Sequence, residues 1–259
     1  MTRESPGTLL ELAVDVAWRA GRLTLAHFQT GVTAELKADQ SFVTIADRES
    51  ERVARELIEA RFPHDGILGE EFGETRAGAL RRWILDPIDG TNSFVRGVPL
   101  YGVLVGVEEE GVAVVGVLHF PALGETVCAA LGEGCWWNGR RALVSDCSRL
   151  EDAVALTSDA ESMQPHGRAE GWNRLRSRTR FTRTWGDCYG YALVATGRAE
   201  IMADPIMSVW DTAAVRPVIQ ESGGVFTDWN GIDSHTSGHA IATNAALAKE
   251  VRSLLGDDS

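Results

Sequence analysis

Three short acidic motifs in the chain have the residue types and spacing of a metal-binding site. They are GEE at 69–71, DPIDGT at 86–91 and WDTAA at 210–214. The surrounding pattern predicts that each acid lies at the end of a strand or the start of a helix, rather than on an exposed helix face. Carboxylates that crowd together repel one another unless a cation lies between them. The three motifs therefore indicate a cation site.

The DPIDGT motif is the most specific of the three. Asp86 ends an apolar run, and Pro87 is expected to turn the chain so that the carboxylates of Asp86 and Asp89 converge. Mg²⁺ prefers hard oxygen ligands, and the backbone carbonyl of Ile88 can supply a further one. The motif therefore predicts a magnesium site at the end of a strand.

Gly90 and Thr91 begin a new segment directly after these acids. Glycine lets a ligand approach the backbone closely, and free N–H groups at the start of a helix or turn bind anions. One short loop thus offers metal ligands and phosphate donors together. Each remaining acid is less specific by itself, because Asp211 is also typical of a helix cap, and Glu70 and Glu71 of an exposed surface.

The composition is that of a globular chain. Of its 259 residues, 44% are apolar and 24% are charged. The 25 basic and 37 acidic residues give a net charge of −12, which argues against nucleic acid or an anionic membrane as a partner. The four cysteines form no CxxC motif, and no apolar stretch is long enough to span a membrane. The N-terminal stretch has the pattern of an amphipathic helix rather than a signal peptide, so we expect a cytoplasmic protein with reduced cysteines.

Helical and strand patterns follow one another through the whole chain. Helices are expected at residues 8–29, 46–61, 187–197, 211–222 and 245–255. Strands are expected at residues 67–69, 82–86, 101–107, 112–120, 125–131, 154–157, 182–184, 201–203, 225–227 and 240–243, with a turn region at 132–140. No long polar linker divides the chain, and we place a boundary near residue 146 that separates an N-terminal unit, 1–145, from a C-terminal unit, 146–259.

Taken together, the motifs resemble those of the inositol monophosphatase family of Mg²⁺-dependent, Li⁺-sensitive phosphatases. DPIDGT resembles the first signature of that family, and WDTAA with the glycine pair at 223–224 resembles the second. GEE stands at the expected distance upstream, and VTIAD at 43–47 resembles an earlier family motif. The resemblance covers nearly the whole chain. It implies an α/β fold built as a layered αβαβα sandwich, with the active site between the two halves and a homodimeric assembly.

The resemblance also implies a role for each motif residue. The implied ligands of two or three Mg²⁺ ions are Glu70, Asp86, Ile88 through its carbonyl, Asp89 and Asp211. Asp47 and Thr91, together with Glu70, would activate the attacking water, and the amides of Gly90 and Thr91 would bind phosphate. Glu71 would contact residues that bind the metal rather than the metal itself. The implied reaction is hydrolysis of a small phosphorylated metabolite by metal-activated water, with no phospho-enzyme.

Several short sequence motifs indicate which phosphate ester the substrate is. GEEFG at 69–73, FVRGVP at 94–99 and WGD at 185–187 resemble bacterial histidinol-phosphate phosphatases of this fold. The stretch 37–44 resembles theirs as well, except that Phe42 stands where a proline is expected.

Four residues are candidates for contact with the substrate. Asp187 would favour a substrate that carries an ammonium and an imidazole, and the inositol enzymes usually have a small uncharged residue at that place. Asp187 also begins an expected helix, so a capping role stays open. Asp204 and Gly186 are further candidates, and Arg183 is expected either to contact substrate or to pair with an acid.

Two other functions remain open at this point. One is an inositol-1-phosphate phosphatase of broad specificity. The other is a non-catalytic accessory factor of the transcription machinery, a role that some bacterial members of the family have. Altered metal ligands or a basic contact patch would indicate the second, whereas this acidic chain keeps every expected ligand.

Overall fold

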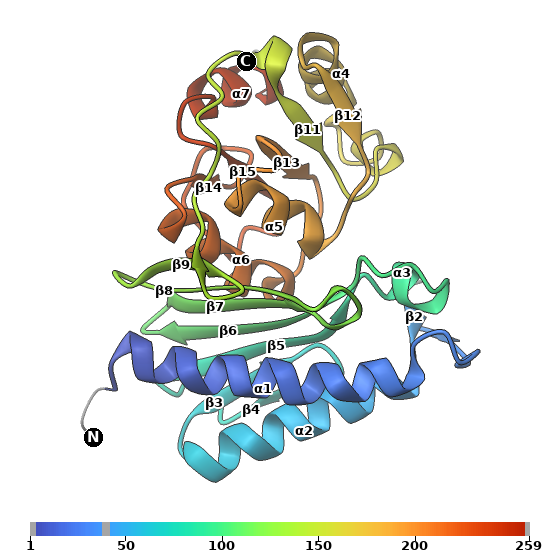
Figure 1. Ribbon diagram of the computed structural model, residues 1–259, viewed down its shortest axis with the longest axis vertical. Helices are drawn as coiled ribbons and strands as arrows, with labels where there is room; N and C mark the ends of the chain where they lie inside the picture. Colours follow the sequence, from blue (N-terminus) through green and yellow to red (C-terminus); the bar gives the residue numbers. More distant parts are fainter. Residues whose placement is uncertain (1–3, 38–41, 257–259) are drawn as a thin grey trace.

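A computed structural model of the chain describes residues 4–37 and 42–256. Five layers of helices and sheets stack along its long axis, in the order helices, sheet, helices, sheet, helices (Figure 1). Apolar clusters fill the spaces between the layers and hold them together. The architecture is an αβαβα sandwich and confirms the fold class that the sequence predicts.

The larger sheet has eight strands in the order β10-β9-β8-β7-β6-β5-β3-β4. These strands are β3 (Gly66–Gly69), β4 (Gly73–Thr75), β5 (Arg81–Asp89), β6 (Gly102–Glu109), β7 (Val112–Phe120), β8 (Glu125–Ala130), β9 (Gly134–Trp137) and β10 (Arg140–Arg141). Helices α1 (Pro6–His27) and α2 (Ile45–Arg61) cover one face of this sheet. A separate pair of strands, β1 (Glu35–Leu36) and β2 (Phe42–Val43), and the short helix α3 (Thr91–Val95) complete the N-terminal half.

The smaller sheet has five strands in the order β12-β11-β13-β15-β14. They are β11 (Val154–Leu156), β12 (Phe181–Arg183), β13 (Ile201–Asp204), β14 (Val225–Thr227) and β15 (Ala240–Thr243). Strands β12, β11 and β13 are parallel neighbours, so their carboxyl ends meet at one edge of the sheet. Helices α5 (Cys188–Ala195) and α6 (Val209–Glu221) lie between the two sheets, and α4 (Ala169–Arg178) and α7 (Ala248–Leu255) cover the outer face (Figure 1).

Helix α6 lies unusually close to the eight-stranded sheet because two glycines face it. A Cβ atom at Gly116 of β7 would lie 1.9 Å from the carbonyl oxygen of Ala214, and one at Gly106 of β6 would lie 3.0 Å from the backbone of Ala213. A Cβ does not fit at Gly116, and at Gly106 it would force α6 to move slightly, so the two glycines together permit the close approach. The contact fixes the start of α6 beside β5. Because α6 packs against both sheets, the boundary near residue 146 stays a prediction.

Three local expectations are wrong. Helix α4 was not expected, because its only buried side chains are those of Trp172 and Leu175 on an otherwise arginine-rich helix. Strand β9 lies inside the expected turn region at 132–140. Pro87 does not turn the chain: β5 continues through it to Asp89, and the pairing with β6 becomes irregular there because proline has no N–H to donate.

All four cysteines are free thiols. Among the described residues, no helix combines the length and the apolar character that a membrane crossing requires.

His119 on β7 gives the fold a pH-dependent contribution to stability. The imidazole is buried against Trp18, with ring centroids 4.9 Å apart, and its Nδ1 lies 2.9 Å from the hydroxyl of Thr126. Burial lowers the pKa of His119 from 6.5 to about 4. The unfolded chain therefore binds a proton between these pH values that the folded chain does not bind, and stability falls as the pH falls through this window.

We expect the free energy of unfolding to fall by about 3 kcal/mol between pH 6.5 and 4 because of His119 alone. H119N should lose this part of the acid sensitivity, and H64N, at an exposed position, should keep it. Urea unfolding of the three proteins across this range measures the difference. Equal pH slopes for H119N and wild type would contradict the assignment.

Candidate active site

Three carboxylates from the two halves of the molecule meet at one point. Asp86 and Asp89 lie at the end of β5, and Asp211 lies in the first turn of α6. Each offers one oxygen, and these oxygens all lie within 4.8 Å of one another. In a regular strand, residues three apart point to opposite faces. The irregular pairing between Asp86 and Asp89 changes that alternation, which lets both side chains reach the same site.

Asp211 combines a capping bond with a place in the cluster. Its Oδ2 accepts a hydrogen bond of 2.7 Å from the backbone N–H of Ser208, the residue that precedes α6. A carboxylate has a second oxygen, so the capping role and the metal-ligand role are compatible.

The electrostatics of the cluster favour a bound cation. Burial, followed by repulsion from Glu70, Asp89 and Asp211, raises the pKa of Asp86 well above its usual range. Burial and the repulsion of Asp187 and Asp211 do the same to Asp89. Buried charges of one sign are costly without a counterion, and carboxylate oxygens are the ligands that Mg²⁺ prefers. The donor set therefore fits Mg²⁺.

Two further oxygens predicted as ligands adjoin the cluster. Glu70 directly follows β3, and the parallel pairing of Gly69 with Leu85 places Glu70 next to Asp86. The Ile88 carbonyl accepts a hydrogen bond of 3.0 Å from the Thr91 hydroxyl, and its second lone pair is left for another partner.

A lysine that the sequence analysis gave no role is bonded to this part of the site. The Lys37 ammonium donates to Glu70 at 2.8 Å and to Glu71 at 2.6 Å. Lys37 lies in the stretch 37–44 that resembles histidinol-phosphate phosphatases, and residues 38–41 of that stretch lie outside the described residues.

Asp47 has the features expected of a group that handles a water proton. It is buried at the start of α2, where its Oδ2 accepts hydrogen bonds from the N–H and the hydroxyl of Thr44 at 2.8 and 2.7 Å. Its Oδ1 has no partner among the described residues. Burial raises the pKa of Asp47 to about 6.

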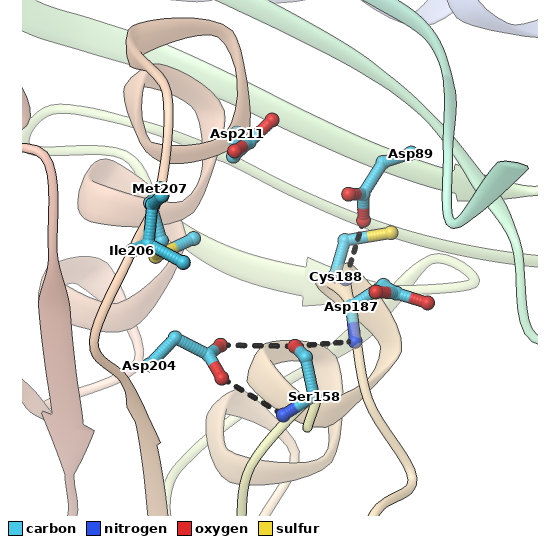
Figure 2. Close-up of a pocket in the computed structure, with 8 residues that line it drawn as sticks. All are labelled: Asp89, Ser158, Asp187, Cys188, Asp204, Ile206, Met207 and Asp211. Atoms are coloured by element: carbon cyan, nitrogen blue, oxygen red, sulfur yellow. Dashed lines mark hydrogen bonds between the residues drawn. The ribbon is translucent and has the colours of Figure 1, made fainter. Parts of the chain in front are cut away.

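A cavity of about 110 Å³ opens beside the carboxylate cluster (Figure 2). Its lining residues are Asp89, Ser158, Asp187, Cys188, Asp204, Ile206, Met207 and Asp211. Four of the eight are acids, and no lysine or arginine is among them. A phosphate ester can enter such a cavity only if cations first compensate its negative charge.

The two predicted substrate-contacting acids differ in how they are bonded. Asp204 is buried at the end of β13 and accepts hydrogen bonds from Thr157, from Ser158 and from the Tyr191 hydroxyl, all between 2.8 and 3.1 Å. The Asp187 carboxylate receives no hydrogen bond or ion pair from the described residues. Its backbone is bonded: the N–H donates to the Ser158 hydroxyl at 2.9 Å, and the carbonyl accepts from the N–H of Gly190 at 3.1 Å.

Asp187 is held in a strained backbone conformation. It precedes α5 with φ 54° and ψ −155°, a region that residues other than glycine rarely adopt, and its side chain makes no capping bond. Burial and the repulsion of Asp204 and Asp211 raise the pKa of Asp187 to about 7. A Cβ at Gly90 would lie 2.8 Å from its Oδ2, so the carboxylate adjoins the expected phosphate loop. These features fit a substrate contact better than a helix cap.

The other two substrate candidates lie elsewhere. A Cβ at Gly186 would lie 2.4 Å from the Cα of Ser158, so Gly186 lets the Asp187 turn pack against the end of β11. Arg183 lies at a different cavity, with Arg176, and forms no ion pair with an acid among the residues that the structure describes. Its guanidinium donates to the carbonyl of Thr182 and lies over the ring of Phe181.

Four lining residues were missed by the sequence analysis: Ser158, Cys188, Ile206 and Met207. The signal for Ser158 was present, because it follows an expected strand. The missing information was that β11, β12 and β13 are parallel neighbours, which brings Ser158, Asp187 and Asp204 to one edge. The backbone N–H of Cys188 donates to Asp89 and so joins the two halves.

Comparisons with known proteins agree with this site. The model of the inositol monophosphatase family matches residues 6–255. A histidinol-phosphatase from Chlorobaculum parvum is 42% identical over 96% of both chains, and one from Mycobacterium tuberculosis is 39% identical over 93% of this chain and 95% of its own. The crystal structure of the extragenic suppressor protein suhB from Bartonella henselae superposes with a TM-score of 0.90 at 27% identity, covering 97% of this chain and 100% of its own.

The fold, the acidic site and these relatives define a phosphatase, an enzyme that hydrolyses phosphate monoesters. The chain belongs to the inositol monophosphatase family.

Replacing Asp86 by asparagine should stabilise the protein without metal and remove its response to metal. D86N removes one buried charge and keeps an oxygen for the N–H of Ile88, which donates to Asp86 at 3.0 Å. In the absence of Mg²⁺ we expect Tm to rise by roughly 2–4 °C, or about 1 kcal/mol for a chain of this size. Added Mg²⁺ should then raise the Tm of wild type and leave that of D86N nearly unchanged.

Thermal unfolding followed by circular dichroism, with and without Mg²⁺, measures both effects. D146N, which removes an exposed aspartate, is the control and should respond to Mg²⁺ as wild type does. An equal Mg²⁺ response of D86N and wild type would remove Asp86 from the metal site.

Proposed function

We propose that the chain is a Mg²⁺-dependent histidinol-phosphate phosphatase, which converts L-histidinol phosphate and water to L-histidinol and phosphate. The observation that carries the substrate assignment is the Asp187 carboxylate, which has no partner among the described residues. It lies next to Gly90 in a cavity whose described lining includes four acids and no lysine or arginine. A cationic organic group is the natural partner of such a carboxylate. The identity to two histidinol-phosphatases supports the same substrate.

Each predicted site residue has a task in this reaction. Asp86, Asp89 and Asp211, with Glu70 and the Ile88 carbonyl, would hold two or three Mg²⁺ ions. When bound, Mg²⁺ supplies the positive charge that neutralises the phosphoryl oxygens and lowers the pKa of water. The backbone N–H groups of Gly90 and Thr91 bind the phosphoryl group, as expected at the start of a helix.

Asp47 and Thr91 act on the attacking water. The Thr91 hydroxyl orients the water, and Asp47 accepts its proton at Oδ1, the oxygen that has no partner among the described residues. A buried carboxylate with a pKa of about 6 is a competent base near neutral pH. The water oxygen forms the new bond to phosphorus, the ester P–O bond breaks, and the leaving alkoxide takes up a proton.

Asp187 and Asp204 divide the recognition of the organic part of the substrate. Asp187 pairs with the ammonium or the imidazole, and Asp204, whose oxygens are bonded to Ser158, Thr157 and Tyr191, holds the floor of the cavity in shape. Arg183 has no part in this proposal because it lines a different cavity.

Other parts of the proposal rest on the family resemblance or on the acidic composition and sequence pattern. They are a homodimer in the cytoplasm, inhibition by Li⁺, and a small metabolite as substrate, with neither nucleic acid nor membrane as a partner.

Phosphate release from L-histidinol phosphate and from inositol 1-phosphate, each with and without Mg²⁺, tests the proposal. We expect Mg²⁺-dependent turnover with a clear preference for histidinol phosphate. Equal or faster turnover of inositol phosphate would favour the broad-specificity alternative. No phosphate release from either ester would favour a non-catalytic role.

D187N should affect the cationic substrate selectively. Losing a hydrogen bond to a charged group costs about 1.5–3 kcal/mol, so we expect KM for histidinol phosphate to rise roughly 10-fold or more. KM for inositol 1-phosphate should change much less, because that substrate has no cation to lose. Steady-state kinetics of D187N and the exposed-site control D146N on both substrates measure the difference, and equal effects on the two esters would refute the role of Asp187.

A further inference from the structure

The carboxylates of the metal site come from two parts of the chain, and these two parts must keep a fixed position relative to one another. Asp86 and Asp89 belong to β5, while Asp211 belongs to α6, more than a hundred residues later. Among the described residues of the C-terminal half, Asp211 alone contributes a carboxylate to this cluster. A small displacement of the first turn of α6 would separate its carboxylate from the other two. Some contact must therefore fix this turn relative to β5.

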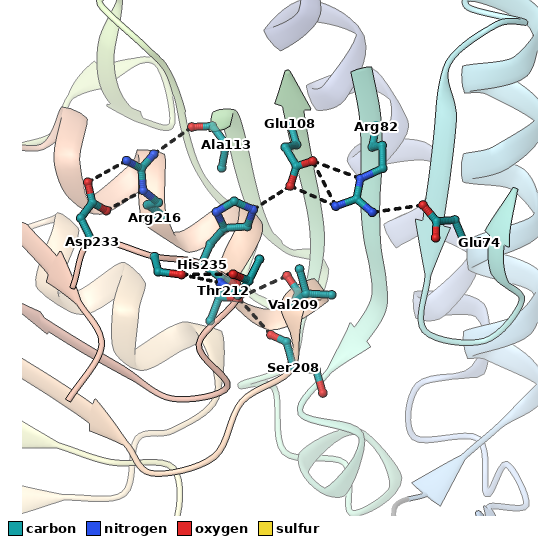
Figure 3. A network of polar contacts seen from close by, with 12 residues as sticks. Glu74, Arg82, Glu108, Ala113, Ser208, Val209, Thr212, Arg216, Asp233 and His235 are labelled. Carbon is teal, nitrogen blue, oxygen red and sulfur yellow. Dashed lines mark hydrogen bonds and ion pairs between the residues drawn. The ribbon is translucent and has the colours of Figure 1, made fainter. Parts of the chain in front are cut away.

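A chain of polar contacts, half-buried at Arg82 and buried at His235, joins β5 to this turn (Figure 3). It begins with Arg82, which lies on β5 four residues before Asp86 and pairs across the ladder with Glu108 of β6. The Arg82 guanidinium donates to both oxygens of Glu108 at 3.1 Å, and it is itself held by Glu74 of β4 at 3.1 Å. A forked pair of this kind fixes the position of the carboxylate.

The next step crosses to the C-terminal half. The Nε2 of His235, in the loop between β14 and β15, lies 2.8 Å from Oε2 of Glu108. Both side chains are buried, with exposed fractions of 5% and 6%. Because an ionised carboxylate only accepts hydrogen bonds, the imidazole donates here. Burial would raise the pKa of Glu108, but its bonds to Arg82 and His235 outweigh burial and lower it.

The last step reaches the residue beside the metal ligand. The Thr212 hydroxyl donates to the backbone carbonyl of His235 at 2.6 Å, the shortest of its three contacts. Thr212 directly follows Asp211, and both lie in the first turn of α6. The contacts therefore run without a gap from the strand that carries Asp86 and Asp89 to the turn that carries Asp211.

We propose that His235 is a positioning residue for the metal site, which holds Asp211 in reach of Asp86 and Asp89 through Thr212 on one side and Glu108 on the other. The proposal rests on the proposed function in one respect, namely that these three acids bind Mg²⁺. It adds a role for a histidine that touches neither metal nor substrate.

The same loop offers a matched control. Asp233, two residues before His235, pairs with Arg216 at 2.7 and 2.8 Å and accepts a hydrogen bond from Gln220. Arg216 and Gln220 lie further along α6, beyond the turn that carries Asp211. Loss of Asp233 therefore loosens the loop from α6 without breaking the contacts from Glu108 to Thr212.

Direct Mg²⁺ binding to the metal-free protein, measured by isothermal titration calorimetry, is the test. Loss of a group that orients a ligand typically costs 10–100-fold in metal affinity, so H235F and T212V should each bind Mg²⁺ at least about 10-fold more weakly than wild type. H235Q, which keeps an N–H at a similar reach, and D233N should stay within about twofold. The double variant H235F/T212V should bind Mg²⁺ little more weakly than the weaker-binding of the two single variants, because both substitutions interrupt the same chain of contacts.

Circular dichroism and thermal unfolding show whether each variant is folded. T212V leaves the buried hydrogen bond between Glu108 and His235 intact, so it carries the test if H235F does not fold. Wild-type affinity in folded H235F or T212V would overturn the proposal, as would a loss in D233N equal to that in H235F. Absence of Mg²⁺ binding by wild type would instead contradict the metal site of the proposed function, and this inference with it.

Discussion

The crowding of three carboxylates, one buried and two half-buried, is the constraint on which the rest of this structure depends. Burial first, and then the charge of neighbouring acids, raises the pKa values of Asp86, Asp89 and Asp211, and such crowding is tolerated only where a ligand relieves it. The irregular end of β5, the glycines beneath α6 and the contacts of His235 all serve to keep these acids together. Stability of the metal-free protein and metal binding are opposed here. A substitution that removes one of these charges relieves the repulsion, but it also removes a metal ligand.

The same acidic surroundings explain how one cavity can select a substrate of mixed charge. The phosphoryl end requires cations, which the carboxylate cluster attracts, and the organic end meets an acid that has no partner among the described residues. Asp204 is saturated by its neighbours, whereas Asp187 is held in a strained backbone beside Gly90. The proposed specificity and catalysis therefore use carboxylates with different bonding states, as is common where one fold tunes several acids.

Much of the site could be predicted from the sequence, because each motif is local. DPIDGT places Asp86 and Asp89 in one short segment, and the apolar pattern before it predicts the strand. Arg183 illustrates the limit, since its nearness to Asp187 in sequence did not bring it to the same cavity. Likewise, the contacts of His235 and Ser158 depend on strand order and on a loop that crosses between sheets, which periodicity does not encode. Helix α4 escaped prediction because few of its residues are buried.

The central claim is that the two halves of the chain together form one cation site between Asp86, Asp89 and Asp211. Its most direct test is an anomalous-difference map from crystals of this protein soaked in Mn²⁺, which has the same ligand preference as Mg²⁺. The account predicts a peak within bonding distance of carboxylate oxygens from both β5 and α6. A map at saturating Mn²⁺ with no peak there, or with a peak that contacts only one half of the chain, would contradict it.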